Sequence, residues 1–539
     1  MRKPYVLVTL LVATLLLSAC TTQTDEQQVT QRGMEDMPCH QMPDGSWMGD
    51  CDNQEQRTTE ARFLPADNTQ ETQFPPAQPT QEIRVGDGEE ITLTADIVEW
   101  SVDGQALIGY GYNQMIPGPT LRVQQGSSIT VHFTNNLDLP TTIHWHGLRH
   151  DIAFDGVPGV SQEEVQPGES FSYELYFPDD GMYWYHPHVR EDIQQEAGLQ
   201  AAIIVEPTTP YNEVAQEEIL ILDDIRLENN NYAAFGEEHA NFAMMGRFGN
   251  TFLVNAQTNY EQEVQAGTVT RLYLLNTANV RPLNISIPGA NIKLVGGDLG
   301  LYEQEEIIDS LIIAPAERYI IEVLFEEERT YELLHTSPHS TNTLGKIHAT
   351  NRAATDNQEL FTEQTRREVQ EDIAQFSEYF DKPIDYELSL TVAMHGMQHG
   401  MGGGMMQPAH PIEWEDDMNM RMSAEQVQWR ITDKDTQQTN MELEMKARVG
   451  DVLKIRLVNE ERSMHPMHHP MHLHGQRFLI THIDEEPVEN KVWKDTVLVP
   501  VGATIDLLVD VTNPGKWMIH CHVPEHMEAG MMSWLLVEE

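Results

Sequence analysis

The stretch LRVQQGSSITVHFTNN, residues Leu121–Asn136, decides the fold because its pattern returns twice later in the chain. Each copy has a glycine nine residues before an asparagine. The pairs are Gly126 and Asn135 here, Gly267 and Asn276 in EVQAGTVTRLYLLN, and Gly450 and Asn459 in ARVGDVLKIRLVN. A strand, a turn at the glycine and a second strand account for each copy. The repeat therefore predicts three related β-sandwich domains.

Short alternating strands separated by Gly, Pro and Asn surround these repeats, and few segments have helical spacing. We predict an all-β fold with three Greek-key β-sandwich domains at residues 83–206, 213–350 and 385–539. Residues 351–384 contain the charged segment QELFTEQTRREVQEDIAQFSEYF, whose helical spacing predicts a linker-helix region.

The N-terminus, MRKPYVLVTLLVATLLLSAC, has basic residues, a short apolar run and small residues before Cys20. This pattern is typical of an export signal. Its last four residues, LSAC, resemble the lipobox of bacterial lipoproteins, which implies removal of residues 1–19 and lipid attachment to Cys20. The alternative is an ordinary cleaved signal with a chance cysteine. We expect a protein held at the cell envelope, on the periplasmic or outer-membrane face, by its lipid alone.

Residues 20–82 are rich in Gln, Thr, Asp and Pro and are predicted to be a flexible tether. Within it, Cys39 and Cys51 bracket the segment CHQMPDGSWMGDC. In an oxidising compartment these two cysteines are expected to form a disulfide. The alternative is a soft copper-binding loop that also uses the histidine and methionines between them.

The charge of the chain excludes one class of partner. Its 85 acidic and 33 basic residues give a formal net charge of -52. Such a surface repels the phosphates of nucleic acids and anionic lipid head groups. We therefore predict no nucleic-acid binding.

Histidines separated by one residue occur in four motifs of the first and third domains. They are His144 and His146 in HWHG, His186 and His188 in HPH, His472 and His474 in HPMHLHG, and His520 and His522 in WMIHCHVPEHMEAGMM. Side chains two residues apart in a strand share a face. The eight imidazoles can therefore line one multinuclear metal site if the first and third domains meet. The corresponding segment of the second domain, NISIPG, has no histidine.

Cys521 lies between two of these histidines and is expected to point to the opposite face of the strand. There it can join His469, His526 and the thioether of Met531. Two imidazoles, a thiolate and a weak thioether form the donor set of a blue-copper electron-transfer site. The backbone of His520, Cys521 and His522 would then connect this site to the histidine site.

In order and spacing, the four motifs resemble those of the multicopper oxidases, and the resemblance covers residue 83 to the end. It implies cupredoxin-like domains and four copper ions. It assigns a type 1 copper to His469, Cys521 and His526 with Met531 axial, a type 2 copper to His144 and His472, and a type 3 pair to His146, His186, His188, His474, His520 and His522.

The resemblance also implies a reaction. A reductant would give single electrons to type 1 copper near an exposed edge of His469 or His526, and Cys521 would pass them on for the reduction of dioxygen to water. By likeness to the family's DG.P segment, Asp155 in FDGVPG is the candidate for proton delivery, although an Asp-Gly pair is also a common turn. Bacterial members commonly place a glutamate where this chain has Met527, so the second proton path is left open.

The segment MHGMQHGMGGGMMQPAHPIEWEDDMNMRM indicates the substrate. Its candidate ligands are Met394, Met397, Met401, Met405, Met406, Met418, Met420 and Met422. The glycines disfavour a stable helix, and thioethers prefer Cu(I). The segment resembles the methionine-rich inserts of cuprous oxidases in copper resistance. Met467, in the separate patch MHPMHHP, stands where those enzymes place a substrate-copper methionine.

We predict an enzyme that oxidises Cu(I) for copper tolerance and uses dioxygen as the electron acceptor. The alternatives are a laccase that acts on phenols or aromatic amines, for which a small aromatic reductant replaces Cu(I), and a non-enzymatic copper store.

Overall fold

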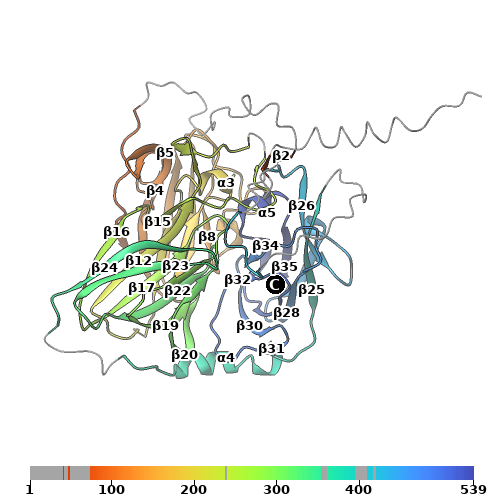
Figure 1. Cartoon of the computed structure of the whole chain (residues 1–539). Coiled ribbons are helices and arrows are strands. Elements are labelled where there is room, and N and C mark those ends of the chain that lie inside the picture. The colour runs from red at the N-terminus through yellow and green to blue at the C-terminus, as the bar shows by residue number, and fades with distance from the viewer. Residues whose placement is uncertain are drawn as a thin grey trace, which may run out of the picture.

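The computed structural model describes residues 73–209, 211–236, 239–353, 361–394, 410–416 and 421–539, together with the paired strands β1 (His40–Gln41) and β2 (Trp47–Met48). The described chain folds into three cupredoxin-like β-sandwiches, which confirms the predicted all-β class. In Figure 1 the central sandwich is green and the C-terminal sandwich is blue, and the two lie side by side.

The first sandwich consists of sheets in the order β5-β4-β7-β9 and β3-β6-β11-β10-β8. Its strands are β3 (Glu82–Val85), β4 (Glu90–Val102), β5 (Gln105–Tyr112), β6 (Thr120–Gln124), β7 (Ser128–Asn135), β8 (His144–His146), β9 (Ser170–Tyr176), β10 (Gly181–His186) and β11 (Ala201–Glu206). Two short helices, η1 (Ile152–Phe154) and α3 (Glu191–Gln194), follow β8 and β10 and lie beside the histidine motifs.

The central sandwich consists of sheets in the order β15-β12-β17-β22-β19-β20 and β16-β24-β23-β18-β21, with the small hairpin β13-β14 beside them. Its strands are β12 (Gln216–Ile225), β13 (Leu227–Glu228), β14 (Asn231–Tyr232), β15 (Thr251–Val254), β16 (Tyr260–Gln265), β17 (Val269–Asn276), β18 (Leu283–Ser286), β19 (Asn291–Gly297), β20 (Gly300–Ile308), β21 (Leu311–Ile313), β22 (Arg318–Leu324), β23 (Arg329–Thr336) and β24 (Thr341–Thr350).

The C-terminal sandwich consists of sheets in the order β26-β25-β28-β33-β30-β31 and β27-β35-β34-β29-β32. Its strands are β25 (Tyr386–Met394), β26 (Val427–Asp433), β27 (Glu444–Arg448), β28 (Val452–Asn459), β29 (His469–Leu473), β30 (Arg477–Ile483), β31 (Glu486–Pro487), β32 (Thr496–Val499), β33 (Thr504–Asp510), β34 (Gly515–Cys521) and β35 (Met532–Glu538). Its helices are η4 (Asn440–Glu442) and α5 (Pro524–Glu528).

The sequence repeat corresponds to the same two strands in all three sandwiches. The first strand of each copy lies parallel to the last strand of its own sandwich, in the pairs β6 with β11, β16 with β24, and β27 with β35. The second strand of each copy belongs to the other sheet. The glycine turn therefore joins the two sheets and does not close a hairpin. All three glycines have positive φ, which side chains with a Cβ rarely adopt.

The repeated asparagine fixes the loop that follows the second strand. Its side-chain amide donates two hydrogen bonds to backbone carbonyls in every sandwich. Asn135 binds Leu139 O and Val165 O at 2.8 Å each, Asn276 binds Arg281 O at 2.9 Å and Ile313 O at 2.8 Å, and Asn459 binds Met467 O at 2.7 Å and Val499 O at 3.0 Å. In the C-terminal sandwich this loop leads directly into His469.

The predicted linker region contains a helix, α4 (Arg367–Ala374), followed by the 3-10 turn η3 (Ser377–Tyr379). Figure 1 shows α4 passing below β20 between the central and C-terminal sandwiches. Trp493 Nε1 donates a hydrogen bond to Asp372 Oδ2 at 2.7 Å, which fixes the helix to the C-terminal sandwich. Among the described residues, no helix is long and apolar enough to cross a membrane.

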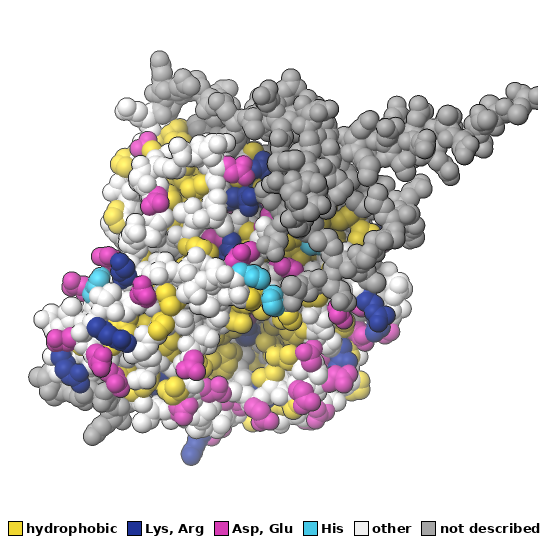
Figure 2. All heavy atoms as spheres, viewed as in Figure 1, with side chains coloured by type: hydrophobic (Ala, Val, Ile, Leu, Met, Phe, Trp, Pro, Cys, Tyr) yellow, Lys and Arg dark blue, Asp and Glu magenta, His cyan; other side chains and the backbone are white. Residues whose placement is uncertain are grey.

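Acidic side chains are spread over the face drawn in Figure 2 and do not gather in one patch. Several sequence predictions lie outside the described residues: the lipid site Cys20, the Cys39 and Cys51 pair, and Met397, Met401, Met405, Met406, Met418 and Met420 of the methionine-rich segment.

Candidate metal centre

Strand pairing brings the histidine motifs together within each sandwich. In the first sandwich β8 lies antiparallel to β10, with His144 opposite His186. In the third, β29 lies antiparallel to β34, with His472 opposite His520. The two strand pairs therefore present their imidazoles from two different sandwiches.

Stacked rings join these two halves. The centroids of His146 and His472 are 3.6 Å apart, and those of His144 and His474 are 4.0 Å apart. Ring nitrogens approach one another closely enough to share an ion in several groups. These are His144 with His472 and His474, His144 with His146 and His186, and His188 with His474 and His520. The first and third domains thus meet at the histidine motifs.

One nitrogen of several rings is held by a protein oxygen. In four histidines the Nδ1 atom donates a hydrogen bond to a backbone oxygen: His144 to Asp155 O (2.7 Å), His186 to Pro187 O (2.8 Å), His472 to Asp495 O (2.9 Å) and His520 to Cys521 O (3.0 Å). The Nδ1 atom of His188 lies 3.2 Å from a side-chain oxygen of Glu191. These bonds fix the orientation and the tautomer of each ring, as outer-shell partners of metal-binding histidines do.

The opposite nitrogens fit a metal ion. Nε2 of His144, His186, His188 and His472 is buried, and no hydrogen-bond partner reaches it from the described residues. In His146 the roles are reversed, because Nε2 approaches Asp495 at 3.1 Å and Nδ1 is the unpaired atom. Buried unpaired polar atoms are costly, and metal coordination removes that cost. Burial also lowers the pKa of His186, so its ring is neutral and keeps a lone pair for an ion.

Two buried residues that the sequence analysis missed hold this cluster in place. Asp495 approaches His146 Nε2 at 3.1 Å, and its own carboxylate accepts a hydrogen bond from Arg318 Nη1 at 2.7 Å. Arg318 belongs to β22 of the central sandwich and also donates to Met182 O of the first at 2.8 Å. Burial alone would raise the pKa of Asp495, but Arg318 and His146 hold it well below its usual range. The central sandwich thus contributes to the site although it supplies none of its histidines.

A second group lies on the other face of β34. Cys521 Sγ is 3.6 Å from His469 Nδ1 and 3.6 Å from His526 Nδ1, and all three side chains are buried. The short helix α5 places His526, and the buried Met531 follows it. Burial raises the pKa of the Cys521 thiol above its ordinary value, so a thiolate there needs a cation beside it. A soft metal ion suits this donor set.

The predicted exposed edge of His469 or His526 is absent, because neither ring has exposed surface. The Trp429 ring packs against both, with centroid distances of 4.9 Å to His469 and 4.2 Å to His526. This indole comes from β26, far from either histidine in sequence, so strand patterns could not reveal it.

Two carboxylates near the histidines were not assigned from the sequence. Glu525 is buried within α5, and burial together with Asp192 raises its pKa to about 8. Glu191 in α3 is also buried, and burial and Asp192 raise its pKa well above the usual value. Met527, at the position where a glutamate was expected, is partly buried against an apolar cluster. Helical geometry turns Glu525 inward, which the sequence did not indicate.

The described methionines of the proposed substrate segment differ in environment. Met394 is partly buried at the end of β25, whereas Met422 is buried in the same apolar core as Cys521. Met422 therefore packs within the sandwich. Met467 is fully buried, two residues before His469.

Comparison with known proteins agrees with this arrangement. Sequence profiles described as multicopper oxidase match residues 95–210, 222–359 and 411–539. The multicopper oxidase MmcO of Mycobacterium tuberculosis is 26% identical over an alignment of 477 residues, and the match covers 82% of this chain and 86% of the relative. The copper resistance protein A homolog of Pseudomonas syringae pv. tomato is 23% identical, and the match covers 84% of this chain and 93% of the relative.

The crystal structure of a multi-copper oxidase from Pseudomonas thermotolerans superposes with a TM-score of 0.63 at 26% identity, covering 84% of this chain and 100% of that one. Matching profiles thus lie on all three sandwiches, and the cysteine and histidine groups suit copper. The chain belongs to the multicopper oxidase family and is a copper-dependent oxidoreductase that uses dioxygen as its electron acceptor.

Proposed function

We propose that this multicopper oxidase is a cuprous oxidase of copper tolerance, which converts Cu(I) to the less permeant Cu(II) at the cell envelope. The observation that carries the proposal is the burial of His469 and His526 under Trp429. A phenol needs access to the edge of one of these rings, whereas a small soft cation can pass along thioethers.

We assign the resident metals as follows. His469, Cys521 and His526 would hold a type 1 copper with Met531 as a weak thioether donor, His144 and His472 would hold a type 2 copper, and His146, His186, His188, His474, His520 and His522 would hold a type 3 pair. The support is the set of buried nitrogens without partners and the donor chemistry of the Cys521 group. When bound, copper supplies the one-electron redox chemistry, and the protein supplies orientation and electrostatics.

The chain itself supplies the path between the sites and the proton donors. Cys521 is bonded through the backbone to His520 and His522, so electrons that enter at its thiolate cross only a few covalent bonds. Asp155 Oδ2 accepts a hydrogen bond from His474 Nδ1 at 2.9 Å, and this buried carboxylate is the proposed proton relay to the histidine site. Trp429 keeps water from the Cys521 side.

Oxygen uptake by the copper-loaded protein, measured side by side with Cu(I) and with a phenol, tests the proposal. The decisive variant replaces Met397, Met401, Met405, Met406, Met418 and Met420 by serine. This variant leaves the buried Met422 and every proposed resident ligand unchanged. Weaker substrate capture should raise the KM for Cu(I) sharply, while phenol oxidation should hold or rise.

The opposite pattern, with phenol turnover lost and Cu(I) oxidation kept at defined free copper, would assign the chain to the laccases. Unchanged rates with both substrates would show that the segment takes no part in catalysis. A copper-loaded protein without oxygen uptake on either substrate would support the copper-store alternative.

We further propose that the protein is exported and anchored by a lipid on Cys20. The support is the LSAC motif after an apolar run in the N-terminal sequence. The anchor would keep the oxidase where incoming copper first meets the envelope.

A further inference from the structure

Two exposed histidines from different domains meet outside the sites described so far. His339 lies in the turn between β23 and β24 of the central sandwich. His410 is the first residue of the described segment 410–416, which belongs to the C-terminal domain. Their ring centroids are 5.7 Å apart, and the ring planes are inclined by 59°. The fold thus places two imidazoles together where the central and C-terminal sandwiches meet.

This geometry matches that of the histidine pairs proposed to share a copper ion. His144 and His472, assigned to type 2 copper, have ring centroids 5.8 Å apart and planes inclined by 62°. His469 and His526 in the Cys521 group have values of 5.3 Å and 64°. Rings that stack face to face in the histidine site come as close as 3.6 Å. Because each imidazole lies about 2.0–2.1 Å from an ion that it binds, the exposed pair has the separation that a shared ion needs.

The ring nitrogens of the pair are available to a ligand. No hydrogen bond or ion pair joins the ring of His339 or His410 to another described residue. Exposed histidines elsewhere are engaged. His132, for example, lies 2.9 Å from Ser172 Oγ through Nδ1 and 3.1 Å from Glu90 through Nε2. The pair therefore differs from a histidine that serves to link neighbouring strands.

The turn that carries His339 is fixed to the segment that carries His410. Ser337 Oγ accepts the His339 N–H at 3.2 Å, which holds the backbone of the turn. Glu415 Oε1 accepts hydrogen bonds from Ser337 Oγ at 3.3 Å and from Ser340 Oγ at 3.0 Å. A carboxylate that lies five residues after His410 therefore holds the opposite turn in place.

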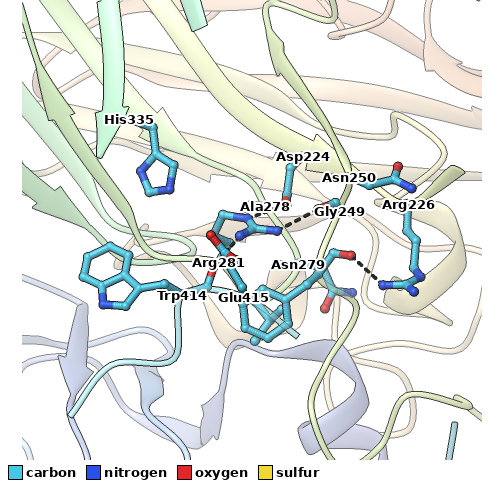
Figure 3. Close-up of polar contacts among 12 residues, drawn as sticks. Asp224, Arg226, Gly249, Asn250, Ala278, Asn279, Arg281, His335, Trp414 and Glu415 are labelled. Atoms are coloured by element: carbon cyan, nitrogen blue, oxygen red, sulfur yellow. Dashed lines mark hydrogen bonds and ion pairs between the residues drawn. The ribbon is translucent and has the colours of Figure 1, made fainter. Parts of the chain in front are cut away.

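The segment itself is fixed to both sandwiches. Pro411 O accepts the Val501 N–H of the C-terminal sandwich at 2.8 Å. Figure 3 shows Arg281 of the central sandwich beside Trp414, and its guanidinium donates a hydrogen bond to Trp414 O. Arg281 is held in turn by Asp224 Oδ2 at 2.6 Å. The two imidazoles are thus preorganised, which lowers the entropic cost of binding an ion between them.

We propose that His339 and His410 bind one divalent transition-metal ion, with Cu(II) preferred, at the surface between the central and C-terminal sandwiches. Imidazole nitrogens suit such ions, and Cu(II) binds nitrogen sites most tightly among the divalent ions of the first row. Solvent can complete the coordination, because both residues are exposed. The site goes beyond the proposed function: it uses neither a resident ligand nor a thioether, and it does not depend on whether the reductant is Cu(I) or a phenol. A bound ion would clamp the turn after β23 to the segment that follows the methionine-rich stretch.

Equilibrium dialysis of the copper-loaded, full-length protein against Cu(II), with free glycine as a weak competing chelator, tests the site. His339→Gln and His410→Gln are compared with the parent, because an amide is a poor ligand for Cu(II). Each variant should bind one Cu(II) ion fewer per chain, or bind it at least tenfold more weakly. Electron paramagnetic resonance of the added Cu(II) should show coupling to two nitrogens in the parent and should lose that signal in each variant.

His132→Gln is the matched control, because His132 is an exposed histidine on β7 of the first sandwich. It should bind Cu(II) as the parent does, and type 1 absorption checks that every variant is folded and loaded. Unchanged Cu(II) binding in both His339→Gln and His410→Gln would overturn the site. A loss confined to one of them would also overturn it, because the proposal requires both rings on one ion. An equal loss in His132→Gln would show that Cu(II) binds to surface histidines without a built site.

Discussion

Asp155 and His474 join the two halves of the histidine site: Asp155 Oδ2 accepts a hydrogen bond from His474 Nδ1 at 2.9 Å across 319 residues of sequence. The backbone carbonyl of Asp155 also accepts from His144 Nδ1 at 2.7 Å. Burial would raise the pKa of Asp155, but His474 and His144 outweigh it and hold that pKa well below the usual range. Asp155 thus sets ring orientation in both sandwiches, through its carboxylate on His474 and its backbone carbonyl on His144, and it is the proposed proton relay.

Asp155→Asn should lower the turnover number by about tenfold to a hundredfold, because an amide keeps the size of the side chain but cannot relay a proton. Steady-state oxygen uptake measures the effect, with type 1 absorption as the check on copper loading. Asp151→Asn is the control: this exposed residue caps the nearby turn η1 and should leave turnover unchanged. Equal turnover numbers for the two variants would show that Asp155 only stabilises the turn and does not relay protons.

Cys521→Ser should abolish the blue charge-transfer absorption and the oxidase activity while circular dichroism still reports a β fold. An alcohol is a poor substitute for a soft thiolate, so the copper content should fall by about one ion per chain. Met531→Leu removes only the proposed weak thioether donor, so it should keep the colour and raise the reduction potential. Blue colour in the serine variant would mean that the type 1 site is wrongly assigned.

Asn459→Ala should destabilise the protein and disturb the Cys521 group. It leaves the carbonyls of Met467 and Val499 without their donor, at a cost of about 2–4 kcal/mol. Asn135→Ala is the matched variant in the first sandwich, where the same two bonds are lost in the loop that leads to His144 and not to His469. Both should lower the thermal midpoint, but only Asn459→Ala should change the type 1 spectrum. An unchanged type 1 spectrum in both variants would show that the hydrogen bonds of the repeated asparagine do not affect copper binding.

His335→Asn should make the central sandwich less sensitive to acid. Burial, helped by Arg281 and opposed by Glu415, lowers the pKa of His335 from 6.5 to about 4. The unfolded chain therefore takes up the proton first, so stability present above pH 6.5 is lost as the pH falls toward 4. Asparagine can still accept the Asn284 N–H but does not titrate. The free energy of unfolding of wild type should fall by about 2–3 kcal/mol more than that of the variant between pH 7 and pH 4.

Unfolding followed by circular dichroism at several pH values measures this difference. His348→Asn is the control, because His348 is partly exposed on β24. Parallel pH curves for wild type and His335→Asn would contradict the assignment.

Cys20→Ala, with the rest of the signal intact, should release soluble, active oxidase from the membrane fraction. The lipid supplies the membrane affinity, and the catalytic sandwiches do not. Fractionation followed by oxygen uptake measures both properties. A variant that still sediments with membranes would contradict lipid anchoring.

The sequence by itself determined the sandwich class and the types of donor. The glycine and asparagine repeat recurs in all three sandwiches, because strand alternation and positive-φ turns are local properties. The same alternation separates Cys521 from His520 and His522, so the existence of two sites could be predicted before any fold was known.

Only the tertiary structure decided how those donors are held. Asp495, Arg318 and Trp429 act on histidines that are far away in sequence, and His339 meets His410 from another domain. A local sequence pattern cannot predict such contacts, because they form only when the sandwiches dock and exclude water. Docking also buried His469, for which the sequence predicted an exposed edge. Burial is a property of the assembled surface, whereas ligand chemistry belongs to the residue itself.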